Sequence, residues 1–287
     1  MTPAISPIIS CSRRTDVPAF LMEWVVDKIQ KKRVDVSNPF NQKITTVSLD
    51  PQDVIAWVWW SKNYQPWIDS YTNNPDIFSQ YNVHIFNFTI NSVSELETGL
   101  VLPLSDRFKQ LKWLIDLFGV DHLQVRFDPI VFYTKIGSNT ILNNLSDFEL
   151  IVSKISNLGI KKVIFSFAEA YSKVKKRMFH RGKVMLQLSK EEKRTEIGAL
   201  LDISKQFDIT LHACCQPELV GYKGIQQSHC VDGELINKLA KKKIKLTRDK
   251  GQREHCGCQK SRDIGGYTGI FKCGHNCDYC YAIPTRK

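Results

Sequence analysis

Short apolar segments alternate with helical patterns along most of this chain, and that alternation constrains the fold more than any other feature of the sequence. Runs rich in β-branched and aromatic residues predict strands at residues 4–10, 53–62, 82–91, 123–129, 162–167 and 208–215. Apolar residues at helical spacing predict helices at residues 20–29, 105–118, 145–158, 190–207 and 234–242. Because such alternation is typical of parallel βαβ units, we predict an α/β fold, an incomplete six-stranded (β/α) barrel similar to a TIM barrel.

Polar residues stand at the carboxyl ends of the predicted strands. They are Ser12, Ser61, Asn87, Arg126, Asp128, Ser166, His212 and Cys215. Reactive groups of α/β barrels gather at this end, so we expect the functional site there. Residues 12–16 either bind an anion between two guanidinium groups or begin a helix with a cap and ion pairs, and the sequence leaves both open. The basic residues 173–187 are predicted to form a mobile insertion.

The composition limits the possible functions. The chain has 287 residues, of which 43% are hydrophobic and 24% charged, as in ordinary globular proteins. Its start lacks a basic region followed by a long apolar run, and no segment has the apolar length of a membrane span. We therefore expect a cytoplasmic protein with no membrane contact. In that reducing compartment nine cysteines indicate metal binding rather than disulfides.

The net charge of +11 favours polyanionic partners, including nucleic acid or a phosphorylated substrate. A solubilising basic surface explains the same charge. We favour this second interpretation, because the basic runs at 173–177 and 241–245 lack interleaved aromatic residues that could stack on bases.

The C-terminal residues 246–287 carry five of the nine cysteines. We predict that they form a Cys-rich tail over the strand carboxyl ends, in the same structural unit as a barrel spanning residues 1–245. Three of these cysteines, Cys273, Cys277 and Cys280, have the spacing C-x3-C-x2-C, and thiolates this close in sequence can converge on one soft metal centre. A zinc site is the alternative, with His255 or His275 available as further ligands.

The segment from Cys273 to Cys280, with Tyr279 before its last cysteine, resembles the cluster motif of the radical S-adenosylmethionine enzymes. The resemblance implies that Cys273, Cys277 and Cys280 hold three irons of a [4Fe–4S] cluster, whose fourth iron binds S-adenosylmethionine. It also implies reductive cleavage of that cofactor, hydrogen abstraction from an unknown substrate, and an electron donor such as ferredoxin or flavodoxin. In that superfamily the motif usually follows the first barrel strand, whereas here it ends the chain.

A longer pattern supports a family resemblance over nearly the whole chain. It comprises Ser-Arg-Arg-Thr-Asp-Val-Pro at 12–18, Trp-Ser-Lys at 60–62, Arg-Phe-Asp-Pro at 126–129, and the cysteine-rich segment from Gln252 to Ala282. This pattern resembles a bacterial family known as a domain of unknown function. The resemblance implies radical chemistry and names no substrate.

Five further cysteines suggest a second metal site. We predict that Cys230, Cys256, Cys258 and either Cys214 or Cys215 hold a second iron–sulfur cluster. Adjacent residues on a strand point to opposite faces, so at least one of Cys214 and Cys215 is expected to be a buried free thiol. Zinc or no metal at all remains the alternative.

Contacts to S-adenosylmethionine are predicted from polar residues near the strand ends. The glycine-rich Gly-Gly-Glu contact of many superfamily members is absent. We expect Arg126 to pair with the carboxylate of S-adenosylmethionine, and Asn87, Thr89 or Ser166 to meet its amine or ribose. An ion pair between Arg126 and Asp128 is the alternative role for that arginine.

The sequence thus favours a cytoplasmic radical S-adenosylmethionine enzyme on a (β/α) barrel. A zinc-stapled barrel that binds nucleic acid or another polyanion without catalysis is the alternative. A radical enzyme that repairs nucleic acid would combine the charge with the cluster.

Overall fold

The computed structural model describes residues 3–286, and its centre is an eight-stranded parallel sheet. Six of its strands are those predicted from the sequence. They are β1 (Ile8–Cys11), β4 (Ala56–Ser61), β5 (Val83–Thr89), β6 (Leu123–Ile130), β9 (Lys162–Phe167) and β11 (Thr210–Ala213). They lie side by side in chain order, which is the strand order of a (β/α) barrel. The predicted α/β fold is confirmed.

Two short strands form the edges of this sheet. Strand β12 (Gln226–Gln227) pairs with β11, and β13 (Arg262–Asp263) pairs with β1. In the described part of the chain these edge strands are not joined, so the sheet is open. Because β13 comes from the C-terminal tail, the tail belongs to the same sheet as the barrel strands.

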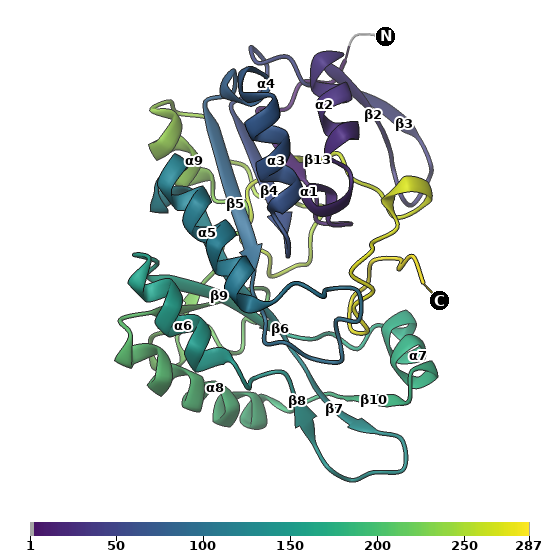
Figure 1. Cartoon of the computed structure of the whole chain (residues 1–287), viewed down its shortest axis with the longest axis vertical. Helices are drawn as coiled ribbons and strands as arrows, with labels where there is room; N and C mark the ends of the chain where they lie inside the picture. The colour runs from purple at the N-terminus through teal and green to yellow at the C-terminus, as the bar shows by residue number, and fades with distance from the viewer. Residues whose placement is uncertain (1–2, 287) are drawn as a thin grey trace.

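Helices cover the outer face of the sheet, where they form the larger hydrophobic core (Figure 1). These helices are α1 (Val17–Phe20), α2 (Met22–Gln30), α3 (Gln65–Asn73), α4 (Pro75–Ser79), α5 (Leu104–Phe118), α6 (Phe148–Asn157) and α8 (Lys190–Gln206). Aromatic residues dominate this core: Trp59 stacks on Trp57, and Trp67 packs edge-on against Phe86. Helices α3 and α4 were not predicted from the sequence; both are short, and each has a proline near its N-terminus.

The inner face of the sheet has a smaller apolar core. Ile8, Val58 and Ile85 project to this face, since residues on a strand alternate between the two sides. Helix α9 (Gly233–Ala240) covers it through Ile236. Several cysteines belong to the same cluster, so this face contains a cysteine site as well as apolar packing.

Antiparallel strands lie outside the main sheet. The hairpin β2 (Arg33–Ser37) and β3 (Ile44–Ser48) forms one pair, and β7 (Phe132–Lys135), β8 (Leu142–Asn143) and β10 (Lys183–Leu186) form a three-stranded sheet. Short 3-10 helices lie at η1 (Val120–His122), η2 (Tyr222–Gly224) and η3 (Gly269–Phe271).

Residues 173–187 are not the mobile insertion that we predicted. They form most of α7 (Ser172–His180) and all of β10, which pairs with β7. Val174 and Met178 are buried against Tyr133 and Leu96, and this apolar side fixes the basic helix on the protein. The many lysines of this segment made its amphipathic helical pattern difficult to recognise in the sequence.

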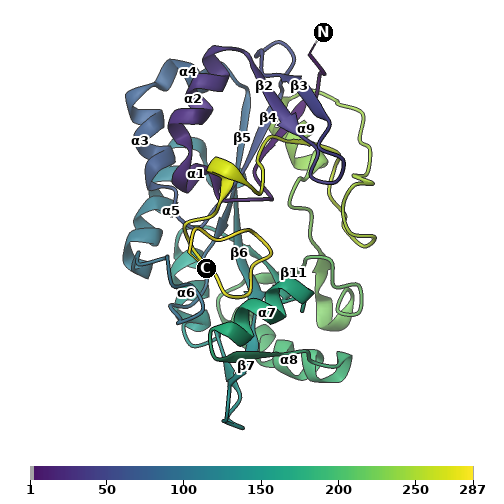
Figure 2. The same ribbon diagram turned by 90° about the vertical axis from the view of Figure 1, so that its right-hand side faces the viewer.

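The C-terminal tail crosses the strand carboxyl ends between α1 and α7 (Figure 2). None of the helices in the described residues combines the length and apolar character needed to cross a membrane.

His84, on β5, is a buried neutral side chain. Trp59 Nε1 donates a hydrogen bond to His84 Nδ1 over 3.1 Å, so Nε2 is the nitrogen that donates to the carbonyl of Phe78, 3.0 Å away. Burial lowers the pKa of His84 to about 4. Protonation of Nδ1 would place its hydrogen against the indole N–H of Trp59, so the charged form of His84 would lose this hydrogen bond.

The free energy of unfolding should therefore fall as the pH drops from about 6.5 toward 4, because the unfolded chain binds a proton that folded His84 does not. The part of the loss due to His84 is on the order of 3 kcal/mol at the acid end. Urea denaturation across this range should show that His84→Gln removes it, while His180→Gln, at an exposed position, leaves it intact. Equal pH dependence in wild type and His84→Gln would contradict this interpretation.

Candidate metal centre

Residues 273–280, which we name the three-cysteine loop, dock on the segment that follows β5. The amide of Asp278 donates to the carbonyl of Leu96 over 2.8 Å, and the amide of Gly99 donates to the carbonyl of His275 over 2.8 Å. A β-carbon on Gly99 would lie 2.0 Å from the carbonyl oxygen of Gly274, so only glycine permits this approach. The loop is therefore held by backbone contacts that fix its position.

Basic side chains of α7 and β10 hold the loop from the other side. Arg177 donates hydrogen bonds to the carbonyls of Cys277 and Ala282, at 3.1 and 2.9 Å, and also to that of Cys280. The fully buried carboxylate of Asp278 accepts from Arg181 and from Lys183, the latter at 3.0 Å. These contacts satisfy loop carbonyls that have no place in a helix or sheet.

The three thiols lie together in a largely buried environment. Cys277 is buried, and Cys273 and Cys280 are partly exposed. The thiols of Cys273 and Cys277 interact electrostatically with that of Cys280 and with each other. Burial raises the pKa of Cys273 to about 11 and also raises the pKa values of Cys277 and Cys280. As free thiols they are protonated at neutral pH, and a metal would release those protons.

A buried polar network lies directly beneath the loop. Glu97 accepts from Lys62 at 2.9 Å, from Asn91 at 2.9 Å and from the hydroxyl of Tyr279. Glu97 is buried, and burial by itself would raise the pKa of its carboxyl group. The pKa is nevertheless below its usual value, chiefly because of the positive charge of Lys62. Lys62 faces both Cys277 and Cys280. A cation thus stands beside two of the three thiols.

The segment after β1 forms a capped helix start, one of the two possibilities for residues 12–16. Asp16 caps α1 through the amide of Ala19 at 3.0 Å, and it also accepts from Ser61 at 2.7 Å. His275 Nε2 lies 2.7 Å from the second oxygen of Asp16, which ties the three-cysteine loop to the ends of β1 and β4. Asp16 accepts from all three segments, so residues 12–16 connect the start of α1, the end of β4 and the three-cysteine loop.

The arginines that we considered for anion binding have protein partners. Arg13 forms an ion pair with Asp249 at 3.0 Å, and Arg14 donates to the carbonyl of Gly265 at 3.0 Å. The hydroxyl of Ser12 donates to Asp263 at 2.8 Å, and the amide of Arg13 donates to the other oxygen of that carboxylate at 2.8 Å. The N-terminal loop therefore fastens the tail.

Five other thiols gather on the inner face of the sheet, and we name them the five-cysteine site. They are Cys214, Cys215, Cys230, Cys256 and Cys258. The Sγ atoms of Cys214 and Cys230 are 3.7 Å apart. Side-chain interactions continue around a ring, from Cys230 to Cys258, Cys256, Cys215 and back to Cys214.

The expectation that Cys214 and Cys215 point to opposite faces is wrong. Strand β11 ends at Ala213, so both cysteines lie beyond it. Cys215 adopts a left-handed conformation with φ of 52°, which turns the chain and lets its thiol contact that of Cys214. Both thiols consequently belong to one site.

The polar residues predicted at the strand ends lie on the inner face and have protein partners. Arg126 donates to Asp128 and to the thiol of Cys230, at 2.7 Å for the latter. Ser166 also donates to Asp128. Asn87 donates to the carbonyl of Cys230 at 3.1 Å, while its Oδ1 has no hydrogen-bond partner in the described residues. The structure thus gathers these residues beside the five-cysteine site.

His212 interacts with polar side chains other than the thiols. Its ring is 3.2 Å from the hydroxyl of Thr210 on the same strand and faces Lys162 and His229. His255 borders a pocket beside Cys215 and Cys256, and His275 is engaged with Asp16.

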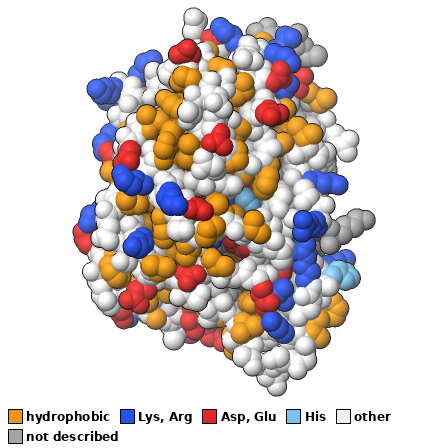
Figure 3. All heavy atoms as spheres, in the orientation of Figure 1, with side chains coloured by type: hydrophobic (Ala, Val, Ile, Leu, Met, Phe, Trp, Pro, Cys, Tyr) orange, Lys and Arg blue, Asp and Glu red, His pale blue; other side chains and the backbone are white. Residues whose placement is uncertain are grey.

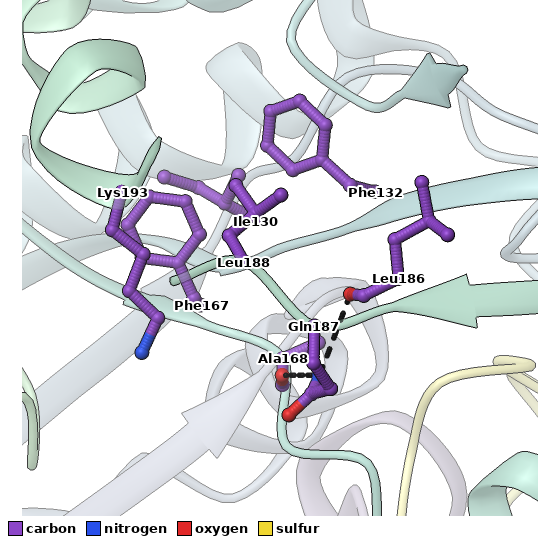
Figure 4. Close-up of a pocket in the computed structure, with 8 residues that line it drawn as sticks. All are labelled: Ile130, Phe132, Phe167, Ala168, Leu186, Gln187, Leu188 and Lys193. Atoms are coloured by element: carbon purple, nitrogen blue, oxygen red, sulfur yellow. Dashed lines mark hydrogen bonds between the residues drawn. The ribbon is translucent and has the colours of Figure 1, made fainter. Parts of the chain in front are cut away.

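In residues 3–286, no three His, Cys, Asp or Glu side chains converge as they would around a single metal ion. In an iron–sulfur cluster, iron and sulfide stand between the thiolates, so its ligands need not meet at one point. The cavity in Figure 4, lined by Ile130, Phe132 and Phe167 among others, measures about 10 Å³. That space is about the size of one water molecule, so it does not accommodate a cofactor.

Several residues around these sites were missed in the sequence. Lys62 and Glu97 form an ion pair 35 residues apart in the chain, and Arg177 reaches carbonyls about 100 residues away. Lys62 lies at the end of a predicted strand, and that position could have indicated that it lies near the functional site. The role of Arg177 could not be found, because backbone acceptors leave no trace in composition.

Fold and site together define an α/β protein with a cysteine-rich tail docked at the carboxyl end of an open sheet. Residues 8–282 match the family described as a domain of unknown function, DUF1848, and the chain belongs to that family. A search of curated proteins finds no match. A crystal structure of D-hydantoinase is similar at 11% identity, with a TM-score of 0.32, over 64% of this chain and 42% of that chain. The chain spans less than half of that protein, and so distant a likeness informs neither fold nor function.

Asp278→Asn should destabilise the protein, because it leaves Arg181 and Lys183 without their buried anion. We expect a loss of about 3–5 kcal/mol in the docking of the tail. Limited proteolysis and hydrogen exchange of residues 262–286 would detect it. Asp116→Asn is the matched control, since its ion pair with Lys112 is more than half exposed and should contribute less than about 1 kcal/mol. Equal protection in the two variants would show that Asp278 does not hold the loop.

Proposed function

We propose that the chain is a radical S-adenosylmethionine enzyme in which Cys273, Cys277 and Cys280 bind a [4Fe–4S] cluster. The supporting observation is that these three cysteines share one anchored loop, held by Arg177 and by backbone hydrogen bonds at the carboxyl end of the parallel sheet. Reactive groups in α/β barrels occupy that end of the sheet. The loop is last in the chain, yet it lies beside the residues that follow β1, through His275 and Asp16.

The residues of this site fit such a cluster. The loop contains three cysteines, so it would leave the fourth iron of the cluster without a ligand from the loop. In the superfamily that the motif resembles, S-adenosylmethionine binds that fourth iron. Lys62, Arg177 and Lys173 all face Cys280 and offset the negative charge of thiolate ligands. Tyr279 and Cys277 are buried in an apolar cluster with Leu96 and Met178. This packing limits water near the thiols.

Radical chemistry in this class comes from the bound cluster and S-adenosylmethionine, which together supply the species that abstracts hydrogen from a substrate. The protein would position these groups. Arg177 fixes three loop carbonyls, and the Lys62–Glu97 pair holds a cation beside two thiols. The reductant would be an external electron donor such as ferredoxin or flavodoxin.

Arg126, Asn87 and Ser166 remain our predicted contacts to S-adenosylmethionine. The unpaired Oδ1 of Asn87 is the atom best suited to receive a donor from the cofactor. Arg126 is already committed to Asp128 and Cys230, so a carboxylate would have to share its guanidinium group with these partners.

The basic composition gives little support to the alternative of a polyanion-binding protein. Lys and Arg side chains on the face shown in Figure 3 are scattered among Asp and Glu. The basic run at 173–177 also contributes Lys173, whose ammonium group lies over the rings of Tyr267 and Tyr281.

Anaerobic reconstitution with iron and sulfide, followed by dithionite and S-adenosylmethionine, should yield 5′-deoxyadenosine. Cys277→Ala should lower this yield to the enzyme-free background and remove about four irons per chain, because it deletes a ligand. Cys11→Ala is the control, since Cys11 is an equally buried thiol in the outer core, away from both groups of cysteines.

A folded, iron-loaded protein that makes no 5′-deoxyadenosine would refute the proposed reaction. A colourless protein that takes up zinc and binds nucleic acid with strong salt dependence would favour the polyanion-binding alternative.

A further inference from the structure

We infer that the five-cysteine site is a second iron–sulfur centre, in which the four buried thiols of Cys214, Cys230, Cys256 and Cys258 are the ligands. The inference is independent of the proposed function, because it uses no residue of the three-cysteine loop. It assigns a full set of four thiolates, so this centre has no place for S-adenosylmethionine.

The thiols contact one another as well as the apolar side chains around them. Cys214 and Cys230 approach to 3.7 Å, and Cys258 interacts with both Cys230 and Cys256. These residues come from three separate segments, so local turn geometry does not account for their meeting. Free structural cysteines behave as small apolar residues in a core. A ring of sulfur atoms from distant segments is the arrangement that a metal cluster requires.

An apolar wall surrounds the site on the sheet side. Ile8, Val58 and Ile85 belong to the same buried cluster as the four thiols, as do Ile236 of α9 and Val231 just before that helix. Iron–sulfur clusters depend on such limited solvent access. The amide of Val231 also donates to the thiol of Cys258 over 3.4 Å, as amides near cluster sulfurs do.

Arginines supply positive charge around these thiols. Arg126 donates to the Sγ of Cys230, Arg13 faces Cys258 and Cys230, and Arg253 faces Cys215 and Cys214. Four thiolates around an iron–sulfur core carry a net negative charge that nearby arginines would offset, whereas neutral thiols have no charge to offset.

One of these donors has no protein partner. The Nη2 of Arg13 is buried and without a hydrogen bond in the described residues, although Nη1 is paired with Asp249. Buried guanidinium nitrogens normally find an acceptor. A cluster sulfur or thiolate beside Cys258 would provide one.

Cys215 is the thiol left over. It is partly exposed and lines a pocket of about 510 Å³ together with Cys256, Arg248 and His255. The other four thiols are at most 8% exposed. Burial therefore separates the four ligands from Cys215.

The test uses the full chain with the three-cysteine loop disabled by Cys273→Ala, Cys277→Ala and Cys280→Ala. After anaerobic reconstitution this variant should retain about four irons and matching sulfide per chain. Adding Cys230→Ala and Cys256→Ala should remove them, whereas adding Cys11→Ala or Cys215→Ala should not. Circular dichroism checks that each variant is folded. Cys230→Ser and Cys256→Ser, which keep the side-chain volume, replace any alanine variant that unfolds.

A folded loop-disabled variant without iron, or with one zinc instead, would overturn the inference. So would iron that survives loss of both Cys230 and Cys256. Iron retained in the loop-disabled variant, with no 5′-deoxyadenosine from wild type, would leave this centre standing and refute only the proposed function.

Discussion

The pairing of β13 with β1 is the contact on which both cysteine groups depend. It joins Arg262 and Asp263 to Ile9 and Ser10, and Asp263 then accepts hydrogen bonds from Ser12 and Arg13. Strand β13 lies between the two groups along the chain, with Cys256 and Cys258 before it and the three-cysteine loop after it. A β-carbon on Gly265 would lie 2.0 Å from the hydroxyl of Ser12, so the backbone at Gly265 packs directly against the Ser12 side chain. One short strand therefore sets the position of both.

Part of the positive charge in this protein stabilises its own structure. Arg177, Arg181 and Lys183 hold the loop, and Arg13 and Arg126 stand beside the second set of thiols. Such side chains cost desolvation energy, which is offset where carboxylates, carbonyls or thiolates meet them. The excess of Lys and Arg that suggested a polyanion as partner is thus partly used in binding the tail to the sheet.

Much of the fold was predictable, because strands buried on one or both faces leave runs of Val, Ile and aromatic residues, as in residues 162–167. The C-x3-C-x2-C spacing likewise identified the three-cysteine loop, since its thiols are local in sequence. The ring through Cys214, Cys230 and Cys256 was guessed only from their number, as its geometry arises from the ends of β11 and the tail meeting in space. Helix α7 was not predicted, because its many lysines made its apolar side hard to recognise. The opposite orientation of Cys214 and Cys215 was predicted wrongly, because Cys215 has a left-handed backbone conformation.

The meeting of the first and last strands also orders events in time. Ser12 and Asp263 are separated by 251 positions in the chain, yet they form one joint. Most of the sheet can form before residues 246–287 are made, but the five-cysteine site also needs Cys256 and Cys258, and the other site needs the whole three-cysteine loop. A chain cut short before β13 would keep Cys256 and Cys258 but would lose the three-cysteine loop and the strand pairing that joins the tail to β1.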